Sequence, residues 1–168
     1  MSDKLLIWSR GTLFLATLFG AILAGLTIDR YFVQRPAFEH LGAVAWGAYS
    51  RVADLGSAGL VLYPLLGIGN ALFTIATAIL ISLSGSKRLS AVLPIYLATL
   101  LVIGGLAATT QAAPIMLGVG HMGNDPSALQ RAFDGFMFWS ALRGACQVTA
   151  FVLFGLVGLY AAKAHDRH

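Results

Sequence analysis

Four long apolar blocks dominate this chain, at residues 5–28, 57–84, 89–113 and 135–162. A helix needs about 20 apolar residues to cross the hydrocarbon core of a bilayer, and each block is long enough. Only 11% of the 168 residues are charged and 58% are hydrophobic, whereas a soluble domain carries about 25% charged residues. The sequence therefore predicts an all-α fold: one polytopic membrane domain over residues 1–168, built as a bundle of four transmembrane helices.

The first apolar block could be mistaken for a secretory signal. Its core is longer than the roughly 7–15 residues of such a signal, and Asp29 and Arg30 follow where a cleavage site would be expected. We expect a retained first membrane helix. The single cysteine, Cys146, allows no internal disulfide and is expected to be a small core residue.

The distribution of basic residues predicts the orientation. With four spans both termini lie on the same side of the membrane, and the positive-inside rule places the side richer in lysine and arginine in the cytoplasm. The terminal side would hold Lys4, Arg10, Lys87, Arg88, Lys163 and Arg167, and the other side would hold Arg30, Arg35, Arg51 and Arg131. We therefore expect cytoplasmic termini, in a bacterial inner membrane. The sequence contains no stripe of basic and aromatic residues, so no nucleic-acid partner is expected.

The outer segment between the first two blocks is nearly thirty residues long. Pro36 suits the first turn of a helix. Apolar residues then recur at a spacing of three to four: Phe38, Leu41, Ala45, Ala48, Val52 and Leu55. This predicts an amphipathic outer helix that either lies on the bundle or extends the second span outward, with Gly56 and Gly59 interrupting the pattern.

The second outer segment covers residues 113–134 and is rich in glycine near its centre. Asp125 before Pro126 is a good helix start, so the fourth helix is expected to run from about Pro126 to about Ala162. Because binding and catalytic residues concentrate on loops held by a rigid scaffold, any site is expected on this non-cytoplasmic face.

Arg143 is the sharpest signal, because a guanidinium in hydrocarbon costs roughly 2.5–3.5 kcal/mol on insertion scales. Trp139 and Gln147 share its helix face. We expect Arg143 to face the bundle interior toward the second span, with Asp54 or Asp29 as its acidic partner and Asn70 and Gln147 as neutral partners. Three interpretations remain open: a network that fixes helix register, snorkelling to the interface, or a substrate pocket in which Arg143 holds an anion or a carbonyl oxygen.

Other polar and aromatic residues have weaker patterns. His40 and His121, with Glu39, Asp54 and Asp125, could assemble a mixed N/O metal site, but no paired-histidine spacing supports it and a solvated or ion-paired face is favoured. No cofactor is expected, and a metal at His40, His121 and Asp125 is left open.

An aromatic cluster is either an interfacial belt or a stacking surface for a flat substrate: Trp46, Tyr49, Phe133, Phe136, Phe138 and Trp139.

Pro36 after the first span, followed by Asn124, Trp139 and Arg143 leading into the fourth, resembles the pattern of the DUF1772, or anthrone-oxygenase-like, membrane proteins. These are small four-span chains with a long first outer loop, so the resemblance covers nearly the whole chain. It implies cofactor-independent oxygenation of electron-rich polycyclic phenols, an activity of some members.

Two classes of function fit these patterns. One is an enzyme in which Arg143 stabilises a phenolate or enolate and His40 or His121 is the base. Its substrate contacts would come from Asn70, Tyr63, Trp46, Trp139, Gln147, Asn124 and Asp54. The other is a non-catalytic accessory subunit, or a binding protein for a lipid or quinone. Small-residue faces on more than one span also allow a homo-oligomer.

Overall fold

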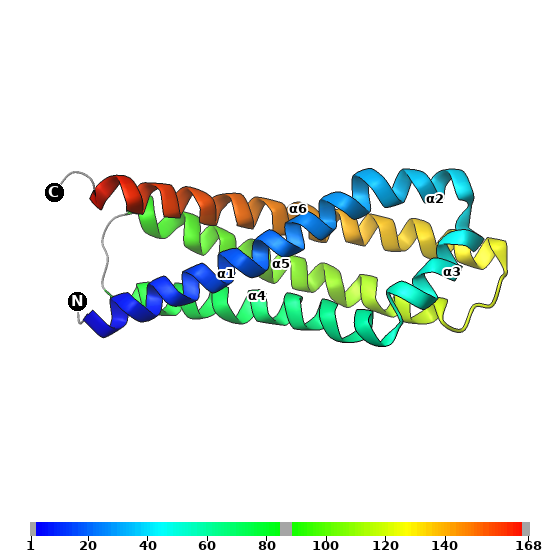
Figure 1. The fold of residues 1–168 in the computed structure, drawn as a ribbon, viewed down its shortest axis with the longest axis horizontal. Helices are drawn as coiled ribbons and strands as arrows, with labels where there is room; N and C mark the ends of the chain where they lie inside the picture. The colour runs from blue at the N-terminus through cyan, green and yellow to red at the C-terminus, as the bar shows by residue number, and fades with distance from the viewer. Residues whose placement is uncertain (1–2, 85–88, 166–168) are drawn as a thin grey trace.

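The computed structural model describes residues 3–84 and 89–165, and throughout them the regular structure is helical, without strands. Four helices are long and apolar enough to cross a membrane: α1 (Asp3–Asp29), α4 (Ser57–Leu83), α5 (Leu89–Val119) and α6 (Pro126–His165). They pack side by side as an elongated bundle, and α1 begins at the end of the bundle where α6 finishes (Figure 1). The predicted four-span bundle is confirmed, and the chain is an integral membrane protein.

The first span continues far beyond the predicted boundary. A π-helical turn, η1 (Arg30–Gln34), follows α1 directly and leads into α2 (Arg35–Leu41) without a break in helical backbone. The apolar stretch from Ile7 to Leu41 has 35 residues. At a rise of about 1.5 Å per residue it is about 50 Å long, against about 30 Å for the hydrocarbon core. The segment that begins near Pro36 therefore extends span one, whereas we had predicted an independent helix or an extension of span two.

The predicted outer helix is present as α3 (Ala43–Ala53), but it buries a different face from the one expected. Gly42 ends α2 at φ +90° and ψ 160°, a conformation open almost only to glycine, and redirects the chain. Trp46 is 2% exposed and packs inward, whereas Val52 is 80% exposed. The prediction of one apolar helix face from Phe38 to Leu55 was wrong, because it assumed one uninterrupted helix.

The second outer connection is shorter than predicted, since α5 runs to Val119 and α6 starts at Pro126 as expected. Asp125 caps α6: its Oδ1 accepts hydrogen bonds from the Ser127 N–H at 2.9 Å and the Ala128 N–H at 3.3 Å. Arg51 of α3 donates to the Val119 carbonyl, the Gly123 carbonyl and the Asn124 side chain. This arginine fixes α3 to the connection between α5 and α6.

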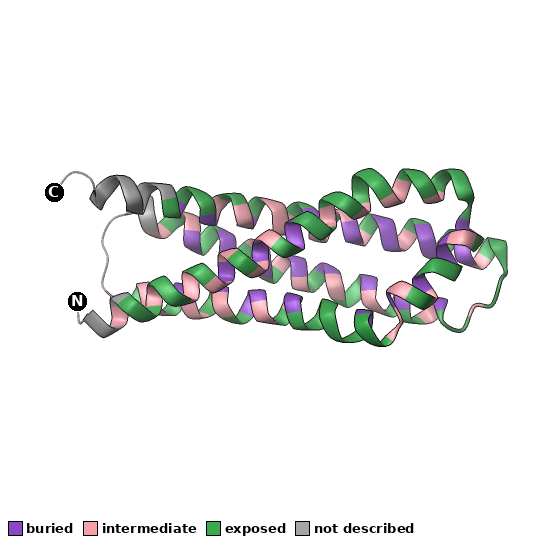
Figure 2. Cartoon of the chain, in the orientation of Figure 1, coloured by how far each residue is buried: buried purple, intermediate pink, exposed green. Residues whose placement is uncertain are grey.

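Buried residues lie on the inward faces of the helices, and exposed residues cover the outward faces (Figure 2). One apolar core fills the end of the bundle where the two outer connections lie, and we call it the loop-end core. Its buried members are Ala43, Trp46, Ala112, Met116, Val119, Leu129, Ala132, Phe133, Phe136 and Met137. A second core, nearer the middle of the spans, is built largely from alanines, and such small residues let membrane helices approach closely.

Candidate functional site

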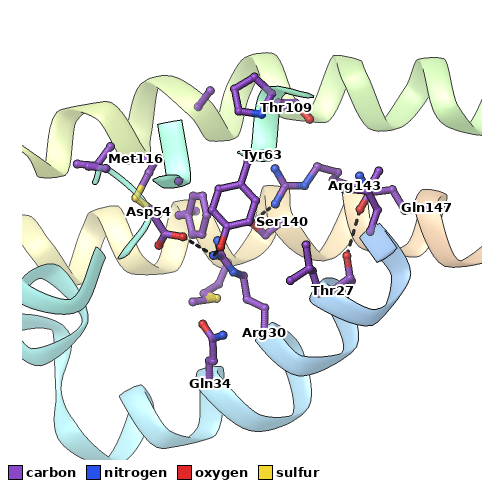
Figure 3. Close-up of a pocket in the computed structure, with 18 of the residues that line it drawn as sticks. Thr27, Arg30, Gln34, Asp54, Tyr63, Thr109, Met116, Ser140, Arg143 and Gln147 are labelled. Atoms are coloured by element: carbon purple, nitrogen blue, oxygen red, sulfur yellow. Dashed lines mark hydrogen bonds and ion pairs between the residues drawn. The ribbon is translucent and has the colours of Figure 1, made fainter. Parts of the chain in front are cut away.

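A cavity of about 490 Å³ lies among α1, α4, α5 and α6, next to the loop-end core. Its walls are mostly apolar, with a few converging polar side chains, several of which are labelled in Figure 3. The polar members are Thr27, Arg30, Tyr31, Gln34, Asp54, Tyr63, Thr109, Ser140, Arg143 and Gln147. Both the size and the lining are those of a site for a small organic molecule.

Exposed lining residues of the cavity lie on α4 and also on α5, where Leu117 is 55% exposed. The lining residues of α6, such as Phe136 and Ser140, are buried or partly buried. By contrast, Leu60 and Ile68 of α4 line the cavity and are 50% and 56% exposed. These exposed residues therefore belong to a helix that is long and apolar enough to cross a membrane.

The loop-end core closes the cavity toward the outer connections. Met116, Phe136 and Met137 belong both to this core and to the cavity wall. Trp46 packs behind them, with its ring centroid 5.3 Å from that of Phe133 and 6.0 Å from that of Phe136. The predicted aromatic cluster is thus partly a core: Trp46 seals the cavity from outside and is not among the residues that line it.

Arg30, the first residue of η1, enters this cavity and forms an ion pair with Asp54, Nη2 to Oδ1 at 2.5 Å (Figure 3). The same nitrogen lies 3.4 Å from the Tyr63 hydroxyl. The guanidinium carbon is 5.5 Å from the centroid of the Tyr63 ring and 5.4 Å from that of Phe136. Such cation–π contacts stabilise a desolvated guanidinium. The charge of Arg30 is therefore neutralised by Asp54 within the protein.

From the sequence, Arg30 is expected only to contribute to the positive charge of the outer surface. A signal was present: Thr27, Arg30 and Gln34 follow one another at intervals of three and four residues, the spacing of one helix face. All three line the cavity. The π-helical turn from Arg30 to Gln34 agrees with the frequent occurrence of such turns at functional sites.

Asp54 is positioned by the tight connection between α3 and α4. Asp54 is the residue that ends α3. A Cβ atom on Gly59 would lie 2.4 Å from the Asp54 carbonyl oxygen and 2.3 Å from that of Ala53. Only glycine permits this approach, so Gly59 holds the start of α4 against the turn that carries Asp54.

Arg143 points into the same cavity, as predicted, and reaches toward Tyr63 (Figure 3). Its predicted ion pairs are not formed, because Asp54 pairs with Arg30 and Asp29 bonds to Gln34 at 2.5 Å. Among the described residues its one hydrogen bond goes from Nη2 to Ser140 Oγ at 3.5 Å, the long limit for such a bond. Its Nε is buried without a partner.

The predicted neutral partners of Arg143 are also engaged elsewhere or distant. Gln147 lines the cavity, and its Oε1 accepts a hydrogen bond from Thr27 Oγ1 at 3.1 Å. Asn70 is buried outside the cavity, and its Oδ1 lies 3.6 Å from the position that a Cβ on Gly20 would take. The positive charge of the Arg143 guanidinium is thus not neutralised by any acidic side chain of the described residues.

The remaining predicted site residues lie outside the cavity. Trp139 packs edge-to-face on Phe138 at 5.2 Å, and Asn124 accepts the hydrogen bond from Arg51. His40 on α2 and His121 after α5 are exposed and line no part of the cavity. Neither predicted base is placed to exchange a proton with a molecule bound at Arg143.

The candidate acidic ligands of the predicted metal site are engaged in other contacts. Glu39 pairs with Arg35 at 2.8 Å, Asp54 pairs with Arg30, and Asp125 caps α6. Within residues 3–84 and 89–165, no three histidine, cysteine or acidic side chains gather as a metal site would require.

Comparison of the chain with protein families, with curated proteins and with solved structures gives no match. The resemblance to the anthrone-oxygenase-like proteins therefore stays a prediction.

Proposed function

We propose that this protein is a membrane-embedded binding protein that takes a lipophilic small molecule from the bilayer and binds its polar head group at Arg143. The observation that carries the proposal is the pairing of a laterally open, mostly apolar cavity with one guanidinium that no acidic side chain neutralises. A purely structural arginine would have its donors satisfied by the protein, since buried polar groups are almost always hydrogen-bonded.

The shape of the cavity supports entry from the membrane. The loop-end core covers it on the outer side, whereas exposed apolar residues of α4 border its opening. A lipophilic molecule is concentrated in the bilayer and would reach this opening without crossing water. Its apolar part would contact the leucines and isoleucine of the walls, and its oxygen atoms would meet Arg143.

Binding is favoured over oxygenation because the cavity lacks the expected base. The enzyme hypothesis needed His40 or His121 next to the substrate, and both histidines lie elsewhere. A ligand-binding or accessory role needs no such group.

Cytoplasmic termini form part of the same proposal. Arg30 lies in the cavity, so it no longer counts toward the charge of the outer surface. Arg35, Arg51 and Arg131 remain there, against six basic residues on the terminal side. The positive-inside bias is therefore larger than the sequence alone indicated.

A variant that fills the cavity tests the binding function. Thr109 of α5 lines the cavity and its hydroxyl bonds only to the Gly105 carbonyl of its own helix, so Thr109→Phe should fold and occupy the site. The control is Ile103→Phe, on the exposed face of the same helix. The protein in lipid nanodiscs is titrated with pyrenedecanoic acid and with its methyl ester, and energy transfer from tryptophan to pyrene is recorded.

We expect saturable binding of at least one probe to the parent protein and to Ile103→Phe, and none to Thr109→Phe. If neither probe saturates on the parent protein, or if Thr109→Phe binds as well as the parent, the cavity is not a binding site and the proposal fails.

A further inference from the structure

We propose that the ligand of this cavity is a singly charged carboxylate on a lipophilic body, rather than a neutral carbonyl compound or a phosphate monoester. This inference rests on the proposed binding function and narrows it to one class of molecule. The charge of the walls, the free hydrogen-bond donors and their arrangement each support it.

The net charge of the cavity walls favours a ligand with one negative charge. Three charged side chains line it: Arg30, Arg143 and Asp54. Arg30 and Asp54 neutralise each other at 2.5 Å, which leaves a net charge of one positive unit from Arg143. A monoanion would balance this charge. A neutral ligand would leave it unmet, and a dianion would leave an excess negative charge in a poorly solvated space, which is strongly unfavourable.

The available donors favour a planar head group. Arg143 makes only the long contact to Ser140 Oγ at 3.5 Å, so its terminal nitrogens are nearly free. A guanidinium presents its N–H groups as a flat fork that matches the two oxygens of a carboxylate. Arg30 is less suited to this role, because its Nη2 is paired with Asp54 and its guanidinium carbon lies 5.5 and 5.4 Å from the centroids of the Tyr63 and Phe136 rings.

The walls around Arg143 fit a lipophilic body attached to that head group. Ile68 and Leu60 border the opening on α4, and Leu26 of α1 faces the same space. A carboxylate at Arg143 would therefore have apolar contacts between its head group and the lipid. The volume of about 490 Å³ is in the range that encloses a molecule of drug-like size.

The experiment compares matched probes that differ only in the head group. The nanodisc protein is titrated with pyrenedecanoic acid, its methyl ester and the corresponding pyrenyl alkyl phosphate, at a pH where the carboxylic acid is ionised. Each probe is measured on the parent protein, on Arg143→Gln, on Arg143→Lys and on Arg131→Gln. Arg131 is an exposed arginine of the same helix that does not line the cavity, so it controls for the loss of one positive charge.

We expect the acid to bind the parent protein at least about tenfold more tightly than the ester, because charge-assisted bonds to arginine are the stronger ones. The phosphate should bind less tightly than the acid. Arg143→Gln should lose the preference for the acid, Arg143→Lys should retain part of it, and Arg131→Gln should retain all of it.

Three outcomes would overturn the inference: equal binding of acid and ester, tighter binding of the phosphate, or a preference for the acid that survives in Arg143→Gln. In each of these the cavity still binds lipophilic molecules, so the uptake part of the proposed function stands, but a preference that survives in Arg143→Gln would also show that Arg143 does not bind the head group. If no probe saturates, the proposed function itself has failed.

Discussion

Arg30 and Asp54 form an ion pair of 2.5 Å between the end of the first span and the turn that precedes the second. The pair joins residues 24 positions apart at the point where the loop-end core meets the cavity. It also explains why Arg143 has no acidic partner, since the one carboxylate that lines the cavity is already taken. The two arginines thus have different roles: Arg30 stabilises the fold, and Arg143 remains available to bind a ligand.

Removal of Asp54 is predicted to destabilise the fold strongly. The side chains of Arg30 and Asp54 are only 15% and 6% exposed, and breaking a buried pair on one side costs roughly 3–5 kcal/mol because the other charge is left unpaired. Asp54→Ala should therefore unfold at a much lower temperature in detergent. The double variant Arg30→Leu with Asp54→Leu should recover most of the loss.

Glu39→Ala is the matched control for this prediction. It breaks the exposed pair between Arg35 and Glu39 on α2, and exposed pairs contribute about 0.2–1 kcal/mol. Equal melting temperatures for Asp54→Ala and Glu39→Ala would show that the cavity pair is not structural.

Replacement of Arg143 by leucine is predicted to stabilise the empty protein. Arg143 has no ion pair among the described residues, and an arginine in mid-membrane costs up to roughly 2.5–3.5 kcal/mol on insertion scales. Arg143→Leu should therefore melt at a higher temperature than the parent protein and lose the binding of pyrenedecanoic acid. A lower melting temperature would instead make Arg143 a device for helix register, which is the interpretation that the sequence left open.

The parts of the fold that were predicted correctly depend on local patterns. The four spans follow from the length of the apolar blocks, and the start of α6 follows from Asp125 and Pro126, because a cap acts within its own first turn. The parts that were missed depend on contacts between distant segments. The spacing of Thr27, Arg30 and Gln34 places Arg30 on one helix face but does not say that this face meets a cavity, and Asp54 reaches Arg30 only because α3 folds back after Gly42.

Gly42→Ala is predicted to weaken the outer end of the bundle. Residues other than glycine at φ +90° and ψ 160° carry a strain of about 1–3 kcal/mol. Gly11→Ala is the control: Gly11 lies within α1 with no neighbour near a new Cβ, and alanine in a helix interior is better than glycine by roughly 0.5–1 kcal/mol. Thermal unfolding should therefore shift down for Gly42→Ala and not for Gly11→Ala, and a downward shift of equal size in both would contradict this account of the turn.

Alkaline phosphatase fusions should report the orientation, because this enzyme is active only outside the cytoplasm. A fusion after His168 should be inactive, since the terminal side carries the larger number of basic residues. A fusion after Gly123, in the connection between α5 and α6, should be active. The reverse pattern would show that the cavity lies nearer the cytoplasmic leaflet than the outer one.

Acid is predicted to weaken the start of α6 through its cap. The hydrogen bond from the Ser127 hydroxyl, followed by those from the Ala128 and Ser127 N–H groups, lowers the pKa of Asp125 below its ordinary value of 3.8. Because the folded state has the lower pKa, this stabilisation is complete above that ordinary value and is lost as the pH falls through the pKa of the folded state.

Asp125→Asn keeps a capping side chain but cannot ionise. The difference in stability between the parent protein and Asp125→Asn should therefore shrink in acid, whereas Asp134→Asn, which removes an exposed carboxylate later in the same helix, controls for the loss of one negative charge. A difference for Asp125→Asn that stays constant down to strongly acidic pH would mean that the cap works equally well without its charge.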